Sequence, residues 1–198
     1  MRLLEKLKDG AFDPALNMLY GSTDRSRAEH VARQFLLRFP EHAAEAAFFS
    51  APGRTEIGGN HTDHQHGCVL CASVDLDMLA CAAPNGSETI RIFSEGYGLS
   101  SVSVKQLQPQ NAERATTSAL IRGVAAGTAA LGFQPGGFDA YVHSTVIAGS
   151  GVSSSAAFSS LSCAFPAMSF SRSMQVRIRS RLAFALSIIS AEKFSGLL

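Results

Sequence analysis

The sequence has few cysteines, little net charge and no long apolar run. Each of these three features argues against one class of protein. Four cysteines in 198 residues are too few for a disulfide framework, so we expect a reducing, cytoplasmic environment. With 17 basic and 16 acidic residues, the net charge indicates neither a nucleic-acid partner nor a membrane surface. The longest apolar run, Leu182 to Ile189 interrupted by Ser187, is too short to span a bilayer, and no signal peptide is expected.

Carboxylates are scarce in the last part of the chain. After Asp139 the only acidic side chain is Glu192, whereas five basic residues lie in that stretch. The basic segment from Arg172 to Arg181 lacks interleaved aromatic residues, so a solvated face is favoured over a nucleic-acid patch.

The apolar pattern predicts an α+β fold. With 46% hydrophobic residues, the chain has the composition of a globular domain. A weak helical pattern in the first twenty residues is broken by Gly10 and Pro14, and Ser26-x-x-Glu29 resembles a capping box. Asn85-Gly86 between apolar runs predicts a hairpin of antiparallel strands. The expected helices are 26–40 and 120–131, and the expected strands are 46–50, 67–74, 76–83, 89–93, 101–104 and 138–147.

The stretch from Ala51 to Gly67 has the composition of a binding site. Glycines at Pro52-Gly53 and Gly58-Gly59 predict a loop with bends. Between them lies Arg54, a permanent cation able to stabilise a developing anion. Directly after them comes the run Asn60-His61-Thr62-Asp63, which offers hydrogen bonds to a polyhydroxylated ligand. The alternatives are a solvated polar loop and a metal site built from His61, His64 and His66.

A second motif, Ile147-Ala-Gly-Ser-Gly-Val-Ser-Ser-Ser-Ala-Ala-Phe158, follows a predicted strand. Glycines and serines before helix-compatible residues place amides and hydroxyls at a helix N-terminus, where a phosphate is stabilised. The motif lacks the Gly-Lys-Ser/Thr of a Walker loop and the third glycine of a dinucleotide fingerprint, and an ordinary flexible turn is the alternative. Cys68-x-x-Cys71 has an apolar interior and no second pair, so both cysteines are predicted to lie in the core.

Together, GRTEIGGNHTDHQHG and GSGVSSSAA resemble the galactokinases of the GHMP small-molecule kinase superfamily. The resemblance covers about Ser26 to Phe158 and implies a GHMP kinase N-terminal domain, with a ribosomal-protein-like left-handed βαβ unit and a mixed sheet with helices on one face. It divides the chain into an N-terminal helical segment (1–45), that domain (46–158) and a divergent tail (159–198).

The resemblance also implies a role for each matching residue. Arg54 would be catalytic, stabilising the transferring phosphoryl group. The sugar would bind Asn60, His61, Thr62 and Asp63; the family commonly has glutamate where this chain has Asn60. ATP phosphates would bind the loop from Gly149 to Ser155, with Ser155 on Mg²⁺. The members of that loop are Gly149, Ser150, Gly151, Val152 (usually leucine in the family), Ser153, Ser154 and Ser155.

The tail departs from the family pattern. Residues 159–198 hold ten serines, five basic residues and one acid, and the family's catalytic aspartate has no counterpart. We therefore expect a truncated or frame-shifted galactokinase that phosphorylates galactose weakly or not at all. The alternatives are a real, divergent C-terminal helix, a non-catalytic galactose and ATP sensor, and another sugar kinase of the superfamily.

Overall fold

The chain folds around one mixed sheet of five strands. A computed structural model describes residues 2–59, 68, 70–147, 151–152 and 154–165. The strand order is β1-β2-β5-β3-β4, in which β3 and β5 are parallel and the other neighbours antiparallel. The predicted α+β class is thereby confirmed. The strands are β1 (Ala47–Gly58), β2 (Leu70–Pro84), β3 (Thr89–Ser94), β4 (Gly98–Ser103) and β5 (Phe138–Ser144).

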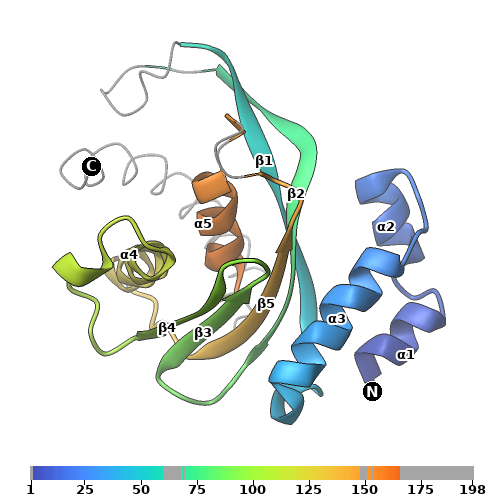
Figure 1. Ribbon diagram of the computed structural model, residues 1–198, viewed down its shortest axis with the longest axis horizontal. Coiled ribbons are helices and arrows are strands. Elements are labelled where there is room, and N and C mark those ends of the chain that lie inside the picture. Colours follow the sequence, from blue (N-terminus) through green and yellow to red (C-terminus); the bar gives the residue numbers. More distant parts are fainter. Residues whose placement is uncertain (1, 60–67, 69, 148–150, 153, 166–198) are drawn as a thin grey trace.

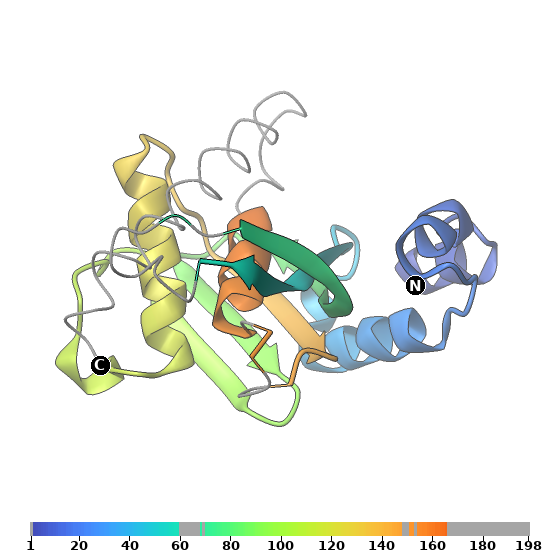
Figure 2. The same ribbon diagram turned by 90° about the horizontal axis from the view of Figure 1, so that it is seen from above.

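Helices cover both faces of the sheet (Figure 1). Two helices of the expected kinase domain, α4 and α5, lie on one face, and α3 covers the other. Figure 2 shows the N-terminal helices gathered on the side away from α4. Helix α5 crosses the boundary expected between residues 158 and 159. The helices are α1 (Arg2–Lys8), α2 (Asp13–Tyr20), α3 (Ser26–Arg38), α4 (Thr117–Ala130) and α5 (Ser154–Ala164), with short 3₁₀ helices η1 (Pro40–His42) and η3 (Asn111–Glu113).

Strand β2 contributes side chains to a hydrophobic core on each face of the sheet, because successive side chains of a strand point to opposite sides. Ala80 and Ala82 pack in the core beneath α4 and α5. Leu79, Cys81 and Ala83 pack in the second core, beneath α1 and α3. All five residues are buried, so the helices on the two faces share one sheet.

The predicted helix from residue 26 is confirmed, but its predicted capping box is wrong. Ser26 is the first helical residue, and the N-cap residue is Arg25, whose side chain makes no capping hydrogen bond. Asp24, which precedes the helix, binds the backbone amide of its first residue: the Asp24 Oδ1 accepts a hydrogen bond of 2.9 Å from the Ser26 N–H. Glu29 instead forms a surface ion pair with Arg33, one helical turn further on.

The predicted Asn85-Gly86 hairpin is wrong, because β5 lies between β2 and β3. The Asn85 amide group donates hydrogen bonds to the Thr89 carbonyl and to Asp139 of β5. The Gly137 N–H also donates to the Ser87 carbonyl at 2.9 Å. The turn is therefore bound to the start of a strand about fifty residues later in the chain, and that strand occupies the space a hairpin partner would take.

The polar stretch begins as a strand, which corrects the predicted loop over residues 51–58. Strand β1 continues to Gly58 and pairs with β2, with register shifts between Pro52 and Arg54 and between Glu56 and Gly58. The two strands predicted at 67–74 and 76–83 are one continuous strand, β2. The outer halves of β1 and β2 therefore form a two-stranded ribbon, since β5 joins β2 only from Met78 onward.

This ribbon explains why one cysteine prediction is wrong. Cys68 and Cys71 are exposed, whereas Cys81 and Cys163 are buried. Cys71 lies on the ribbon, where β1 is the only strand that pairs with β2 among the described residues, and its side chain is exposed there. Within the described residues, no helix has the length and apolar composition needed to cross a bilayer.

Candidate active site

Strand β1 and the Gly/Ser loop meet at Arg54. The Arg54 N–H donates a hydrogen bond of 3.1 Å to the carbonyl of Val152, although the two residues are far apart in the sequence. Val152 is half-buried and packs against the core beneath α5. The structure thus joins the two motifs that the sequence analysis identified separately.

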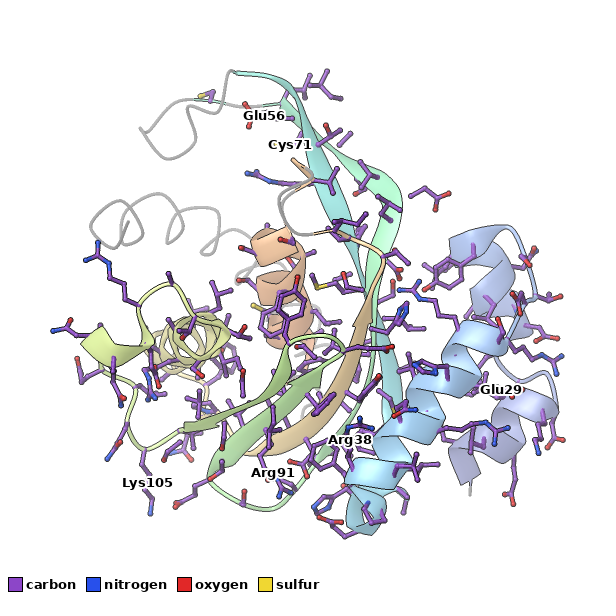
Figure 3. All side chains as sticks on the ribbon, in the orientation of Figure 1. Glu29, Arg38, Glu56, Cys71, Arg91 and Lys105 are labelled. Carbon is purple, nitrogen blue, oxygen red and sulfur yellow. The ribbon has the colours of Figure 1, made fainter. Side chains whose placement is uncertain are left out.

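The guanidinium of Arg54 lies on the two-stranded ribbon. Its Nη1 donates to the Sγ of the exposed Cys71 at 3.4 Å, across the β1–β2 pair. Cys71 is also the register partner of Glu56 on β1 (Figure 3). A cation supported by paired strands keeps a defined position, as stabilising charge in a transition state requires.

The end of the Gly/Ser loop leads into the N-terminus of α5. Gly151 is exposed with φ of 79°, in the left-handed region that favours glycine, and a Cβ there would meet no atom of the described residues within 4 Å. Helix α5 begins at Ser154, which is half-buried, and Ser155 is exposed in its first turn. Backbone amides and a serine hydroxyl at a helix N-terminus suit a phosphate and its Mg²⁺, so the described part of the loop fits the cofactors expected from the sequence.

The sugar-contact residues Asn60, His61, Thr62 and Asp63 lie outside the described residues. The same holds for His64 and His66 of the alternative metal site, and for Gly149, Ser150 and Ser153 of the loop. The structure therefore describes Arg54, Gly151, Val152, Ser154 and Ser155 among the predicted site residues.

One cluster of possible metal ligands occurs in the described residues, at Glu41, His42 and Asp139. Asp139 is fully buried, but both of its carboxylate oxygens accept hydrogen bonds from Arg91, and Asn85 donates to one of them. A cation there would lie beside the guanidinium and compete with it. The cluster is best explained as a structural ion pair that fastens β3 to β5.

Comparison with known proteins finds similarity to galactokinases. The galactokinase galactose-binding signature matches residues 33–84, which include α3's second half, β1 and β2. Over 108 residues the chain is 37% identical to the galactokinase of Chloroflexus aurantiacus, a match that covers 54% of this chain. Over 138 residues it is 28% identical to the galactokinase of Limosilactobacillus reuteri, covering 65% of this chain. The chain is galactokinase-like.

Solved structures agree on the galactokinase-like fold. The crystal structure of Lactococcus lactis galactokinase complexed with galactose superposes with a TM-score of 0.64 at 20% identity, covering 82% of this chain and 43% of that one. The mevalonate kinase of Methanococcus jannaschii superposes with a TM-score of 0.51 at 11% identity, covering 71% of this chain and 46% of that one. At these identities the likeness shows the fold alone, which is that of the GHMP kinases.

The galactokinase-like chain spans only part of its relatives. The matches cover 27% of the Chloroflexus galactokinase and 35% of the Limosilactobacillus one. The activity, substrates and partners of a whole galactokinase are therefore matters for proposal in this chain.

Two features of the candidate site escaped the sequence analysis. Cys71 was assigned to the core, yet it contacts Arg54 from the neighbouring strand. Gly53 was interpreted as a bend, whereas it lies in a strand at a close contact with the Gly/Ser loop. A sequence signal for the first was that Cys71 shares its alternate positions with the polar residues Ser73, Asp75 and Asp77. The position of a glycine directly before the arginine was a signal for the second.

Proposed function

We propose that this chain carries the sugar-binding and nucleotide-binding elements of a galactokinase. The reaction is transfer of the γ-phosphoryl group of ATP to the anomeric hydroxyl of galactose, which gives galactose 1-phosphate. The observation that carries the proposal is the hydrogen bond from the Arg54 N–H to the Val152 carbonyl, because it holds a permanent cation next to a loop suited to phosphate.

The residues then have distinct tasks. Arg54 stabilises the negative charge that spreads over the oxygens of the transferring group. The amides and hydroxyls from Gly149 to Ser155 bind the ATP phosphates, and Ser155 would hold Mg²⁺, which would neutralise phosphate charge when bound. Asn60, His61, Thr62 and Asp63 bind the hydroxyl groups of galactose and so orient the anomeric oxygen.

The test measures galactose binding, Mg-ATP binding and galactose-dependent ADP release by the purified full chain. Arg54→Ala is compared with Arg33→Ala, which removes an exposed arginine of α3. Galactose should bind to both variants. Any ADP release should fall by at least about a hundredfold in Arg54→Ala alone, which is the usual loss when one charge-stabilising group is removed.

The outcomes separate the proposal from its alternatives. A folded chain that binds neither galactose nor Mg-ATP would refute it. Binding of both ligands without turnover would favour the galactose and ATP sensor. Turnover with another sugar in place of galactose would favour a different kinase of the superfamily.

A further inference from the structure

The backbone of β1 and the Gly/Ser loop are in contact at Gly53. A Cβ added to Gly53 would lie 3.0 Å from the Val152 carbonyl oxygen, 3.0 Å from Cγ2 of Val74 and 3.3 Å from Cγ2 of Val146. Each distance is shorter than an ordinary van der Waals contact. No side chain larger than hydrogen fits at this position without movement of its neighbours.

The three neighbours differ in how they can move. Val74 and Val146 present side-chain methyl groups, which can shift by small rotations. The Val152 oxygen belongs to the backbone of the loop, and the Arg54 N–H holds it at 3.1 Å. A Cβ on residue 53 would therefore press on the same carbonyl that ties the arginine to the loop.

The requirement for glycine at this position comes from space. The φ of Gly53 lies outside the left-handed region that favours glycine. The residue sits at the register shift of β1 between Pro52 and Arg54. Such an irregularity brings the strand backbone toward the loop, and only hydrogen at Cα leaves room for it.

We propose that Gly53 is a positioning residue, whose missing Cβ sets the separation between Arg54 and the Gly/Ser loop. The functional part of this inference rests on the proposed kinase site. It adds that the arginine and the phosphate-binding loop keep one fixed geometry because their backbones touch at Gly53.

The chain offers a matched control for Gly53→Ala. Gly58 lies on the same strand, its φ also lies outside the left-handed region, and a Cβ there would meet none of the described residues within 4 Å. Gly58→Ala therefore repeats the chemical change without the contact. A double variant, Gly53→Ala with Val74→Ala, relieves the clash with the valine methyl and leaves the clash with the Val152 carbonyl.

The first measurement is hydrogen exchange of the Arg54 amide in the full chain, which needs no ligand. We expect exchange to accelerate by about fivefold or more in Gly53→Ala, as loss of one backbone hydrogen bond implies, and to stay unchanged in Gly58→Ala. The double variant should regain part of its melting temperature while the Arg54 amide stays fast. Unchanged exchange in Gly53→Ala, or slow exchange regained in the double variant, would overturn the inference, because the contact would then be ordinary packing.

The second measurement links the contact to function. Gly53→Ala should bind Mg-ATP more weakly than Gly58→Ala, with galactose affinity equal in the two. If the chain turns over, kcat should fall in Gly53→Ala while KM for galactose is kept, because the contribution of Arg54 is made in the transition state. Equal Mg-ATP affinity and equal kcat in the two variants would overturn the positioning role.

The two measurements fail in different ways. Faster exchange at Arg54 in a chain whose unsubstituted form binds no Mg-ATP would refute the kinase site and leave the backbone contact standing. Normal exchange at Arg54 in a chain that binds galactose and Mg-ATP would refute the role of Gly53 and leave the proposed function standing.

Discussion

Substituting Asp77 should destabilise the fold at the junction between the N-terminal helices and the sheet. Asp77 is buried on β2, and its carboxylate accepts hydrogen bonds from Arg27 of α3, from the Tyr20 hydroxyl of α2 at 2.7 Å and from the Ser50 hydroxyl of β1 at 2.6 Å. Burial and the adjacent carboxylate raise the pKa of Tyr20 to about 12, so the phenol remains a donor near neutral pH. One carboxylate thus joins four elements.

The expected cost follows from what Asp77→Asn leaves behind. The amide keeps one acceptor oxygen for three donors, and the Arg27 guanidinium loses its counter-charge. Removal of one partner from a buried ion pair costs about 3–5 kcal/mol. Because the Arg27 side chain is 24% exposed, water solvates part of the orphaned charge. We therefore expect a loss of about 2–3 kcal/mol in the free energy of unfolding.

Urea unfolding at pH 7, followed by circular dichroism, measures this loss. Asp75→Asn, an exposed change on the same strand, should stay within about 0.5 kcal/mol of the unsubstituted chain. Arg27→Met combined with Asp77→Asn should cost less than the sum of the two single changes, because the double variant leaves no orphaned charge. A change below about 0.5 kcal/mol in Asp77→Asn, or strict additivity in the cycle, would refute the reasoning.

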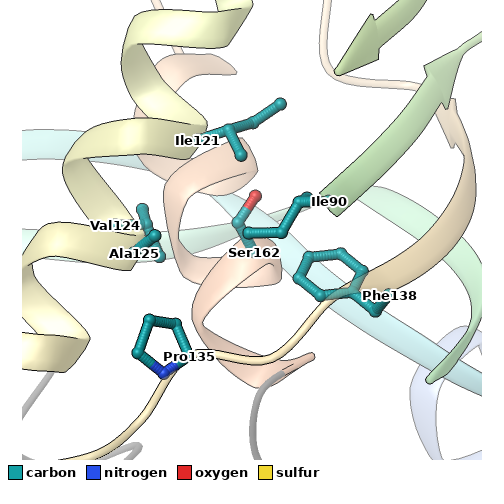
Figure 4. A pocket seen from close by; sticks show the side chains of 7 residues that line it. All are labelled: Ile90, Ile121, Val124, Ala125, Pro135, Phe138 and Ser162. Carbon is teal, nitrogen blue, oxygen red and sulfur yellow. The ribbon is translucent and has the colours of Figure 1, made fainter. Parts of the chain in front are cut away.

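Two further changes test other parts of the structure. Ser162 of α5 is buried, and its hydroxyl has no hydrogen-bond partner among the described residues. It lines a cavity of about 10 Å³ together with the apolar residues Ile90, Ile121 and Phe138 (Figure 4). In urea unfolding, Ser162→Ala should stabilise the chain by about 1 kcal/mol more than the exposed control Ser160→Ala. An equal gain in both variants would trace it to helix propensity. Burial, and then the Arg27 guanidinium, lower the pKa of His143 in the folded chain. Just below the ordinary histidine pKa of about 6.5, the unfolded chain therefore binds more protons at this residue than the folded chain does. The stability contribution of neutral His143 should be complete above that pH and lost as pH falls through the lower folded pKa. His143→Gln should therefore flatten the dependence of the unfolding free energy on pH below about 6.5, and an unaltered profile would contradict this.

The sequence predicts elements well where the period of apolar residues is clear. The helices at residues 26–38 and 117–130 follow from their spacing, and a strand followed by a Gly/Ser loop and a helix follows from the order of residue types around Ile147. These features are local, so local pattern is enough to find them.

Strand order was not predictable from local pattern. Asn85-Gly86 has a strong hairpin composition, yet the side chain of Asn85 donates to Asp139, and β5 separates β2 from β3. The decisive interaction joins residues 54 positions apart. A long-range contact of this kind overrides the preference of a turn, and no short window of sequence contains it.

The candidate site shows the same division between chemistry and geometry. The residue types Arg54 and Ser155 were identified as chemically suitable from composition and resemblance. The secondary structure around Arg54 was not predicted correctly. The polar stretch was predicted as a loop, whereas Arg54 lies on a strand paired with β2. A strand changes the expected behaviour of the arginine, because ladder hydrogen bonds restrict the backbone on both sides of it.

The contact at Val152 extends this restriction to the loop. Strand β1 packs against α5 as well as pairing with β2, so the two elements that flank the arginine and the loop already contact each other. The hydrogen bond from the Arg54 N–H to the Val152 carbonyl lies within that contact. Motion of the loop away from β1 therefore requires loss of this bond and separation of packed surface. We infer that the arginine and the end of the loop move as one unit, which makes geometry at the site depend on β1 and α5 together rather than on either motif alone.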